Sequence, residues 1–232
     1  MPKKISKSTA PAPATTSSSI APIPAGPNIP SFLTDGLPLP ALFVFDLDYT
    51  LWPFWVDTHV TPPIKPIPSS STTYTTSVSD RTGDTFAFYS DVPAILHTLS
   101  LTSKTRVGVA SRTHAPELAR EMLKLLYVAA PAAAPQDDEA TTKRKGKNNK
   151  PRRALDLFDA GMEIYPSSKI RHMEALMKRN AVRGEEILFF DDESRNRDTE
   201  TLGVAMWLVR DGVTWGEVEK GVAEWRRRRG IR

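Results

Sequence analysis

Short apolar runs alternate with amphipathic segments along most of this chain. The apolar runs are not interrupted by polar residues and are rich in β-branched or aromatic side chains, which is typical of strands buried on both faces of a parallel sheet. These predicted strands cover residues 41–45, 105–110, 186–190 and 204–209, and a weaker pattern predicts a fifth strand at 162–165.

Helix signals fill the segments between these strands. Apolar side chains recur every three or four residues, and residues that favour the N-cap position precede several segments. The predicted helices cover about 91–101 and 115–127, a segment after Ser167 or Ser168, a short segment ending at Gly203, and the segment after Thr214. Strands that alternate with helices predict an α/β fold, a three-layer, doubly wound, Rossmann-like parallel sheet.

Three segments differ from this pattern. Residues 1–30 contain few large apolar side chains, so burying them cannot offset the loss of conformational entropy on ordering. We therefore expect a disordered N-terminal lead. Residues 129–153 predict a disordered basic insertion, and residues 73–89 predict a small β-hairpin flap. The length of the remaining chain, residues 31–232, is typical of one folded domain.

The positive net charge of +4 is confined to two short runs. Residues 143–153 carry seven Lys or Arg and residues 226–232 carry five, with no acid in either run, whereas the rest of the chain is acidic. Neither run has interleaved aromatic residues or a recognisable nucleic-acid-binding module. Nucleic acid is therefore not the expected partner.

The sequence lacks both cysteine and a long apolar run, which excludes several classes of site and of protein. The chain has no cysteine, which excludes disulfides, a thiol nucleophile and a cysteine-ligated zinc. No apolar run reaches the roughly 20 residues that a membrane span needs. We expect a cytoplasmic monomer with no membrane partner, and nuclear entry through the basic run at 143–153 remains open.

Reactive side chains follow three of the predicted strands directly. Asp46 and Asp48 follow the first strand, Ser111 follows the second, and Asp191 and Asp192 follow the strand at 186–190. The carboxyl ends of parallel strands meet at one edge of the sheet, where open α/β folds bind ligands. We therefore expect these side chains to share one cleft.

This set of groups suits phosphoryl transfer through a carboxylate nucleophile. Mg²⁺ held by Asp46 and the acid pair at 191–192 would neutralise a phosphate. Lys169 and the Ser111 hydroxyl would hold its other oxygens, and Lys169 lies in the first turn of a helix, where a cation needs a nearby anion. Asp48 is placed to protonate the leaving group and later to take a proton from water.

The same motifs carry a resemblance to a known superfamily. D-x-D-x-T from Asp46, then Ser111, Lys169 and the acid pair at 191–192, resemble the four motifs of the haloacid dehalogenase (HAD) superfamily, in its order. More narrowly, four segments are similar to the magnesium-dependent phosphatase family over roughly residues 41–210. They are Phe45–Val60, Ala110–Thr113, Ile164–Ile170 and Phe189–Glu193.

This resemblance implies a HAD-like fold, Mg²⁺ as cofactor and an aspartyl-phosphate intermediate. No large cap domain is expected, because the segment between the first two motifs is short and the gap after the second is low-complexity sequence. The resemblance implies that Asp46 is the nucleophile and Asp48 the general acid and base. The implied metal ligands are Asp46, the Asp48 backbone carbonyl, Asp192 and, through water, Asp191. The phosphate-binding residues are Ser111, Lys169 and Arg112, although Arg112 alone would equally suit pairing with a surface acid. Asn196 is expected to orient the acid pair.

Several readings stay open at this point. The resemblance implies phosphotyrosine or a phosphorylated sugar adduct on amines as substrate, displayed on a protein or as a small molecule, and the sequence does not choose. The aromatic residues at 52–55 suit either the core or a lid over the cleft. The alternative function is a basic nucleic-acid-binding or scaffold protein with a vestigial HAD site, supported by the two basic runs.

Overall fold

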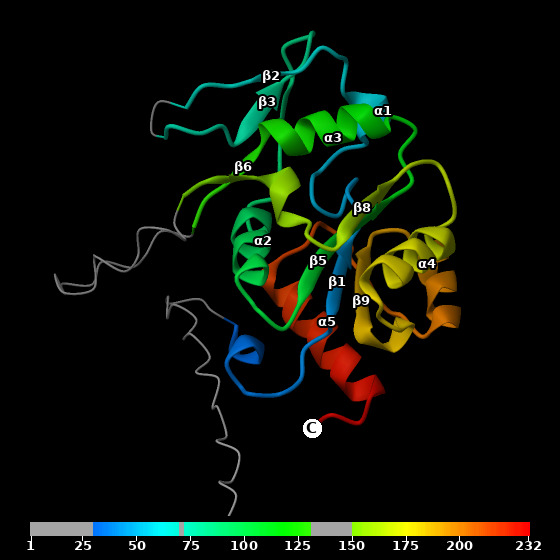
Figure 1. Ribbon diagram of the computed structural model, residues 1–232. Helices are drawn as coiled ribbons and strands as arrows, with labels where there is room; N and C mark the ends of the chain where they lie inside the picture. Colours follow the sequence, from blue (N-terminus) through cyan, green and yellow to red (C-terminus); the bar gives the residue numbers. More distant parts are fainter. Residues whose placement is uncertain (1–29, 70–71, 131–149) are drawn as a thin grey trace, which may run out of the picture.

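Five parallel strands form the central sheet of the computed structural model, which describes residues 30–69, 72–130 and 150–232. Their order across the sheet is β10-β9-β1-β5-β8 (Figure 1). The strands are β1 (Leu42–Phe45), β5 (Arg106–Ser111), β8 (Gly161–Ile164), β9 (Ile187–Asp191) and β10 (Ala205–Leu208). All five predicted strands are confirmed, and so is the parallel α/β fold.

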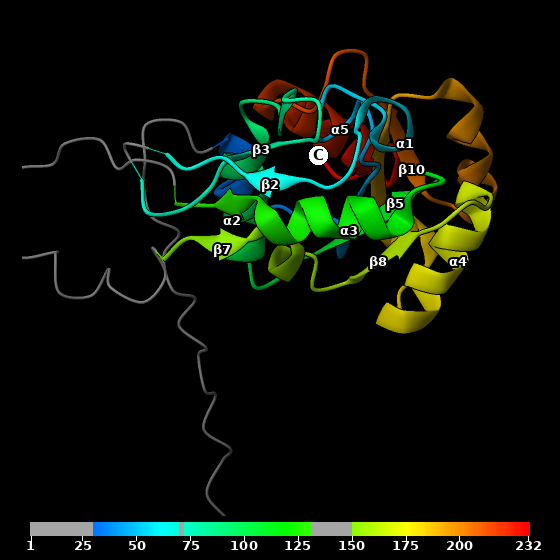
Figure 2. The same ribbon diagram turned by 90° about the horizontal axis from the view of Figure 1, so that it is seen from above.

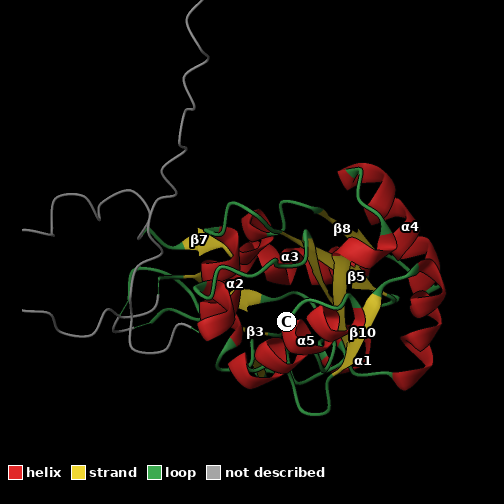
Figure 3. Cartoon of the chain, turned by 90° about the horizontal axis from the view of Figure 1, so that it is seen from below, coloured by secondary structure: helices red, strands yellow, loops and turns green. Residues whose placement is uncertain are grey.

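Helices cover both faces of this sheet, as the doubly wound prediction requires (Figure 3). In β1, Phe43 and Phe45 pack into one apolar cluster, and Leu42 and Val44 pack into another on the opposite face. The first cluster is covered by α2 (Val92–Ser100), α3 (Pro116–Leu125) and α5 (Trp215–Arg228), and the second by α4 (Lys169–Asn180) and the 3₁₀ helix Ser194–Leu202. All four β1 side chains are fully buried, which explains the uninterrupted apolar run.

The predicted hairpin flap forms part of a small antiparallel sheet. Its strands β2 (Lys65–Pro66), β3 (Ser77–Ser79) and β4 (Thr85–Ala87) pair in that order, and β2 and β3 lie beside α3 (Figure 2). The Asp80 carboxylate accepts hydrogen bonds from the backbone N–H groups of Thr61 and Thr82, which joins the turn to the chain before β2. The four-residue helix α1 (Val56–His59) precedes this flap.

Regular structure forms at both ends of the segment that was predicted to be a disordered basic insertion. Helix α3 ends at Leu125, because Tyr127–Val128 forms β6 and pairs antiparallel with β7 (Arg152–Arg153). Backbone pairing does not depend on side-chain composition, so the last two basic residues of the run join a strand. Most of the predicted insertion and of the predicted lead, at 131–149 and 1–29, lies outside the described residues.

Arg226, Arg227 and Arg228 belong to α5 and form ion pairs within the domain. Arg226 is 8% exposed, and its guanidinium forms a bidentate ion pair with Asp35 at 2.5 and 3.1 Å. It also donates to the carbonyl oxygens of Phe32 and Pro38 at 3.2 and 2.9 Å. The hydrogen bond from Arg226 lowers the pKa of Asp35. This residue therefore fastens the segment that precedes β1 to α5.

Replacing Arg226 with alanine is expected to lower the free energy of unfolding by about 2 kcal/mol, because hydrogen bonds from a charged donor to buried acceptors are lost. The matched control is Arg227→Ala, since Arg227 is exposed and its ion-pair partner among the described residues is Glu224 on the same helix. That change should cost under about 0.5 kcal/mol. Urea unfolding of both variants measures the difference, and equal midpoints would contradict the structural role of Arg226.

Within the three described segments, no helix combines the length and the apolar character needed to cross a membrane.

Candidate active site

The reactive side chains meet in a cleft of about 450 Å³ at the carboxyl edge of the sheet. The predicted residues lie at the ends of three strands or just after them: Asp46 and Asp48 after β1, Ser111 at the end of β5, Asp191 at the end of β9 and Asp192 just after it. Six of the predicted residues line the cleft: Asp46, Asp48, Ser111, Arg112, Lys169 and Asp192. Asp191 lies fully buried at the end of β9. The sequence-based expectation that these residues converge is confirmed by the geometry.

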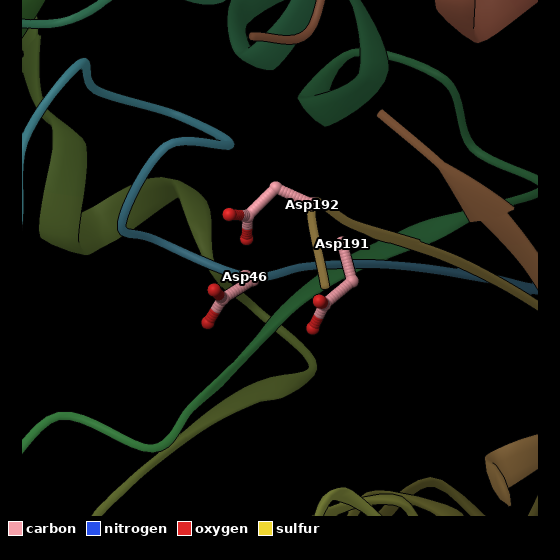
Figure 4. A group of neighbouring side chains, drawn as sticks. All are labelled: Asp46, Asp191 and Asp192. Carbon is pink, nitrogen blue, oxygen red and sulfur yellow. The ribbon is translucent and has the colours of Figure 1, made fainter. Parts of the chain in front are cut away.

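Three carboxylates form the centre of the site. One oxygen from each of Asp46, Asp191 and Asp192 lies within 4.8 Å of the others, and Figure 4 shows the three side chains grouped around one space. The ladder between β1 and β9 sets this arrangement, because the Asp46 N–H donates to the Phe190 carbonyl at 2.9 Å. Two neighbouring strands thus bring acids from distant positions together.

Lys169 supplies a buried ammonium to this group. Its Nζ lies 2.6 Å from Asp46 Oδ1 and 2.8 Å from Asp191 Oδ2, with 1% of its side chain exposed. Ser168 caps α4, since its hydroxyl accepts a hydrogen bond from the Arg171 N–H, and this cap places Lys169 in the first turn. The unfavourable position of a cation at a helix start is therefore offset by two carboxylates.

The single ammonium of Lys169 cannot neutralise the three carboxylates of Asp46, Asp191 and Asp192. Burial raises the pKa of Asp46 well above its ordinary value, with Lys169 opposing the rise and Asp191 adding to it. Burial, and then repulsion from Asp191, raises the pKa of Asp192 to about 6. Burial lowers the pKa of Lys169, but the two carboxylates outweigh it and raise the pKa overall. Three clustered acids, of which Asp46 and Asp191 are buried and Asp192 is partly exposed, favour a further cation beside the one ammonium.

Asp48 lies beside the cluster and is held separately. Its Oδ1 accepts hydrogen bonds from the Trp52 indole N–H at 2.7 Å and from the Val56 backbone N–H at 3.3 Å. Burial raises the pKa of Asp48 to about 6 despite both hydrogen bonds. Both bonds fall on the same oxygen, so within the described residues Oδ2 is left without a hydrogen-bond partner.

A tight turn holds Asp48 in this place. The N–H groups of Thr50, Leu51 and Trp52 all donate to the Leu47 carbonyl, at 3.2, 2.8 and 3.3 Å. The turn requires Tyr49 to adopt a left-handed backbone with φ of 52°. A non-glycine residue in that region is strained, and such strain is concentrated at functional sites.

The remaining predicted residues complete the wall of the cleft. Ser111 ends β5 and is buried, and its hydroxyl accepts a long hydrogen bond of 3.4 Å from the Thr113 N–H. Arg112 lines the cleft and donates to the Asn196 side-chain oxygen at 3.3 Å. Arg112 therefore pairs with an amide rather than with a surface acid.

Asn196 orients Asp191, as the sequence predicts. Its side-chain N–H donates to Asp191 Oδ1 at 2.8 Å, and the Glu193 backbone N–H donates to the same oxygen at 2.8 Å. Asp191 Oδ2 is thereby turned toward Lys169. The 3₁₀ helix that begins at Ser194 supplies this support for the acid pair.

The aromatic residues at 52–55 are divided between the core and the cleft, which was not predicted from the sequence. Trp52 and Phe54 are buried and stack on each other, whereas Trp55 is 49% exposed and lines the cleft. The run therefore serves both the core and the cleft. The spacing of four residues between Asp48 and Trp52 was the available signal, because one helical turn brings such residues together.

Two histidines near the site have different surroundings. His172 is fully buried, its Nε2 contacts the Tyr165 carbonyl at 3.1 Å, and burial and then Lys169 lower its pKa to about 4. His114 differs, because it lines the mouth of the cleft, where its backbone N–H donates to Asp57. Its lone position in the sequence gave no sign of this placement.

Comparison with known proteins decides the family. The family model described as acid phosphatase matches residues 38–228, which include the whole sheet and the cleft. This chain belongs to the acid phosphatase family. The match extends through α5, beyond the region where the sequence motifs end.

Two curated relatives agree with membership of the acid phosphatase family. A Schizosaccharomyces pombe protein described as a HAD-like hydrolase superfamily protein is 38% identical over 172 residues, covering 74% of this chain and 87% of that protein. Human magnesium-dependent phosphatase 1 is 36% identical over 187 residues, covering 79% of this chain and 86% of that protein. The expected phosphatase assignment is confirmed at the level of the family.

Proposed function

We propose that this acid phosphatase family member is a Mg²⁺-dependent phosphomonoester hydrolase that works through a phosphoryl group carried on Asp46. The observation that supports this most is the cluster of Asp46, Asp191 and Asp192 with Lys169 in one cleft. These side chains supply a carboxylate that could attack phosphorus, acids that could hold a cation and an ammonium that could bind phosphate. Asp48 adds a proton donor beside them.

The residues present fit a magnesium ion. Mg²⁺ takes oxygen ligands, commonly one or two carboxylates, and leaves its other positions to water and substrate phosphate. Asp46, Asp192 and the Asp48 backbone carbonyl would hold the ion directly, and Asp191 would hold it through water. When bound, it neutralises charge on the phosphate and on the acids.

The chain's own residues account for phosphoryl transfer. The Asp46 carboxylate attacks phosphorus, a new oxygen–phosphorus bond forms, and the ester bond to the leaving oxygen breaks. The Lys169 ammonium and the Ser111 hydroxyl hold the other phosphate oxygens, and Arg112 extends this positive wall. These groups are fixed before substrate arrives, since Lys169 and Ser111 are buried.

Asp48 handles the protons in both halves of the reaction. Its Oδ1 is held by Trp52 and Val56, so Oδ2 can carry a proton to the departing oxygen. Water then attacks the phosphorus of the Asp46-bound phosphoryl group, and Asp48 takes the proton released by that water. Inorganic phosphate leaves, and the Asp46 carboxylate is restored.

The substrate classes that we propose are phosphotyrosine and phosphorylated sugar adducts, which the family resemblance implies. The test is phosphate release by the full chain from phosphotyrosine peptides, phosphoserine peptides and sugar phosphates, with Mg²⁺ and with EDTA. We expect release from at least one class, lost in EDTA and restored by Mg²⁺. Absence of release from every class, or release that EDTA leaves unchanged, would contradict the proposal.

The nucleic-acid-binding alternative loses part of its support. Arg226, Arg227 and Arg228 pair with acids of the domain itself, namely Asp35, Glu224 and Glu200. Side chains engaged in this way are less available to a phosphate backbone. The alternative then depends on the basic run at 143–153, of which only 150–153 lies in the described part.

Replacing Asn196 with alanine is expected to raise the Mg²⁺ concentration for half-maximal activity by about tenfold, because Asp191 loses a hydrogen bond that orients it. The matched control is Asn180→Ala, which removes an amide from α4 that donates to the Ala160 and Leu176 carbonyls, away from the carboxylates. Magnesium titration of both variants gives the result. A similar shift in the two would contradict the orienting role.

A further inference from the structure

Trp55 exposes an apolar surface in the cleft that holds the clustered acids. Among the described residues, the exposed large apolar side chains are Leu37, Trp55 and Leu101, and Trp55 has the largest exposed fraction, 49%. Of these three, Trp55 is the one that lines the cleft with Asp46 and Asp48. An aromatic surface at a cleft mouth that contains converging polar groups is typical of a ligand-binding wall.

The Trp55 ring is held in position before any ligand binds. It stacks on the His59 ring with centroids 5.6 Å apart and an interplanar angle of 24°. It also meets the Tyr49 ring edge to face at 5.2 Å and 77°, and its backbone N–H donates to His59 Nδ1 at 3.1 Å. A ring fixed by two neighbours loses little conformational freedom when a ligand packs on it.

Trp55 lies next to the turn that holds Asp48. Its neighbour Val56 donates to Asp48 Oδ1, and its ring partner Tyr49 directly follows Asp48 in the chain. This inference rests on the proposed function, in which Asp48 protonates the leaving oxygen. The group attached to that oxygen is then next to the Asp48 turn and therefore next to Trp55.

Two polar groups beside Trp55 already have partners within the protein. His59 Nδ1 accepts from the Trp55 N–H, and the two Asp57 oxygens accept from the Thr58 hydroxyl and the His114 N–H. A sugar would need new partners for its hydroxyls on this wall, because polar groups removed from water must be satisfied. A flat apolar ring needs none.

We propose that Trp55 binds the aromatic leaving group of an aryl phosphate by ring stacking and so makes the site selective for aryl phosphates, phosphotyrosine among them. Aromatic pairs at centroid distances of 4.5–7 Å gain stability beyond their buried area, in offset-stacked or edge-to-face arrangements. Between the two substrate classes that the family resemblance leaves open, this wall favours phosphotyrosine.

The test compares Trp55→Ala and Trp55→Phe with the unaltered chain on phenyl phosphate and cyclohexyl phosphate, which differ in aromaticity at a similar ring size. Trp55→Ala should raise KM for phenyl phosphate and for phosphotyrosine by about tenfold with kcat little changed. KM for cyclohexyl phosphate should stay within about twofold, and Trp55→Phe should retain most of the aryl preference. Leu101→Ala, an exposed apolar side chain that does not line the cleft, is the control.

A merely structural role for Trp55 predicts the opposite selectivity. If the change displaced Asp48, kcat would fall, and it would fall more for cyclohexyl phosphate, because the alkoxide is the poorer leaving group and depends more on protonation. Equal losses on both esters, no loss on either, or a loss confined to sugar phosphates would overturn the proposal.

Binding without turnover separates this inference from the proposed function. Phenylphosphonate and cyclohexylphosphonate have no ester bond to hydrolyse, and calorimetry with Mg²⁺ present measures their Kd. We expect phenylphosphonate to bind the unaltered chain more tightly than cyclohexylphosphonate, with the difference lost in Trp55→Ala. An equal Kd for the two ligands would overturn the role of Trp55, whether or not the chain hydrolyses phosphate esters.

Discussion

Asp46→Asn should remove steady-state phosphate release, with a loss of at least about 10⁴-fold in kcat. The amide has no anionic oxygen to attack phosphorus, and it also removes one of the three clustered carboxylates. The measurement is phosphate release from an aryl phosphate in saturating Mg²⁺. Asp57→Asn is the matched control, because Asp57 is a carboxylate of the same cleft that stands outside the cluster.

The same variant should remain folded, which separates loss of chemistry from loss of structure. Asp46 is buried beside two other acids, so its replacement relieves like-charge repulsion, while Lys169 keeps Asp191 as a partner at 2.8 Å. We therefore expect thermal stability that is unchanged or higher, as is common when a strained functional site is neutralised. Steady Mg²⁺-dependent release by Asp46→Asn, with Asp57→Asn also active, would refute the nucleophile assignment.

Asp48→Asn is expected to lower kcat by about 10²–10⁴-fold for alkyl phosphates, since the leaving oxygen is no longer protonated. The asparagine oxygen can still accept the hydrogen bonds from Trp52 and Val56, so the turn should keep its shape. The loss is therefore chemical rather than structural in origin.

The dependence on leaving group tests this role of Asp48. A nitrophenolate leaves without protonation, so the first step should be much less impaired with nitrophenyl phosphate than with an alkyl phosphate. Burst kinetics with nitrophenyl phosphate should then show fast release of the phenolate followed by slow release of phosphate, because the second step still needs a base. Equal losses for both esters and no burst would contradict the assignment.

The sheet and its acids could be predicted because their signals are local. Each buried strand is a continuous apolar run, and the residue after each run is placed by the sheet itself, so Asp46, Ser111 and Asp191 converge without further information. Lys169 could be predicted for a related reason. A cation at a helix start is unfavourable alone, and the two carboxylates that resolve this lie at strand ends.

The rest depends on contacts between residues far apart in the chain. The C-terminal basic run gave no sign that Arg226 is buried against Asp35, because composition treats neighbouring arginines alike while helical geometry turns them in different directions. Trp52 and Trp55 are likewise equivalent by residue type. In the fold, the Trp52 indole is buried and donates to Asp48, whereas Trp55 is the N-cap of α1 and lines the cleft.

Phosphoryl transfer through Asp46 is tested by stopping the full chain during turnover of an aryl phosphate with borohydride, which reduces an acyl phosphate to an alcohol. Peptide mapping should find homoserine in place of Asp46, only when substrate and Mg²⁺ were both present. Homoserine at another aspartate, or none at all in an enzyme that is turning over, would contradict phosphoryl transfer through Asp46.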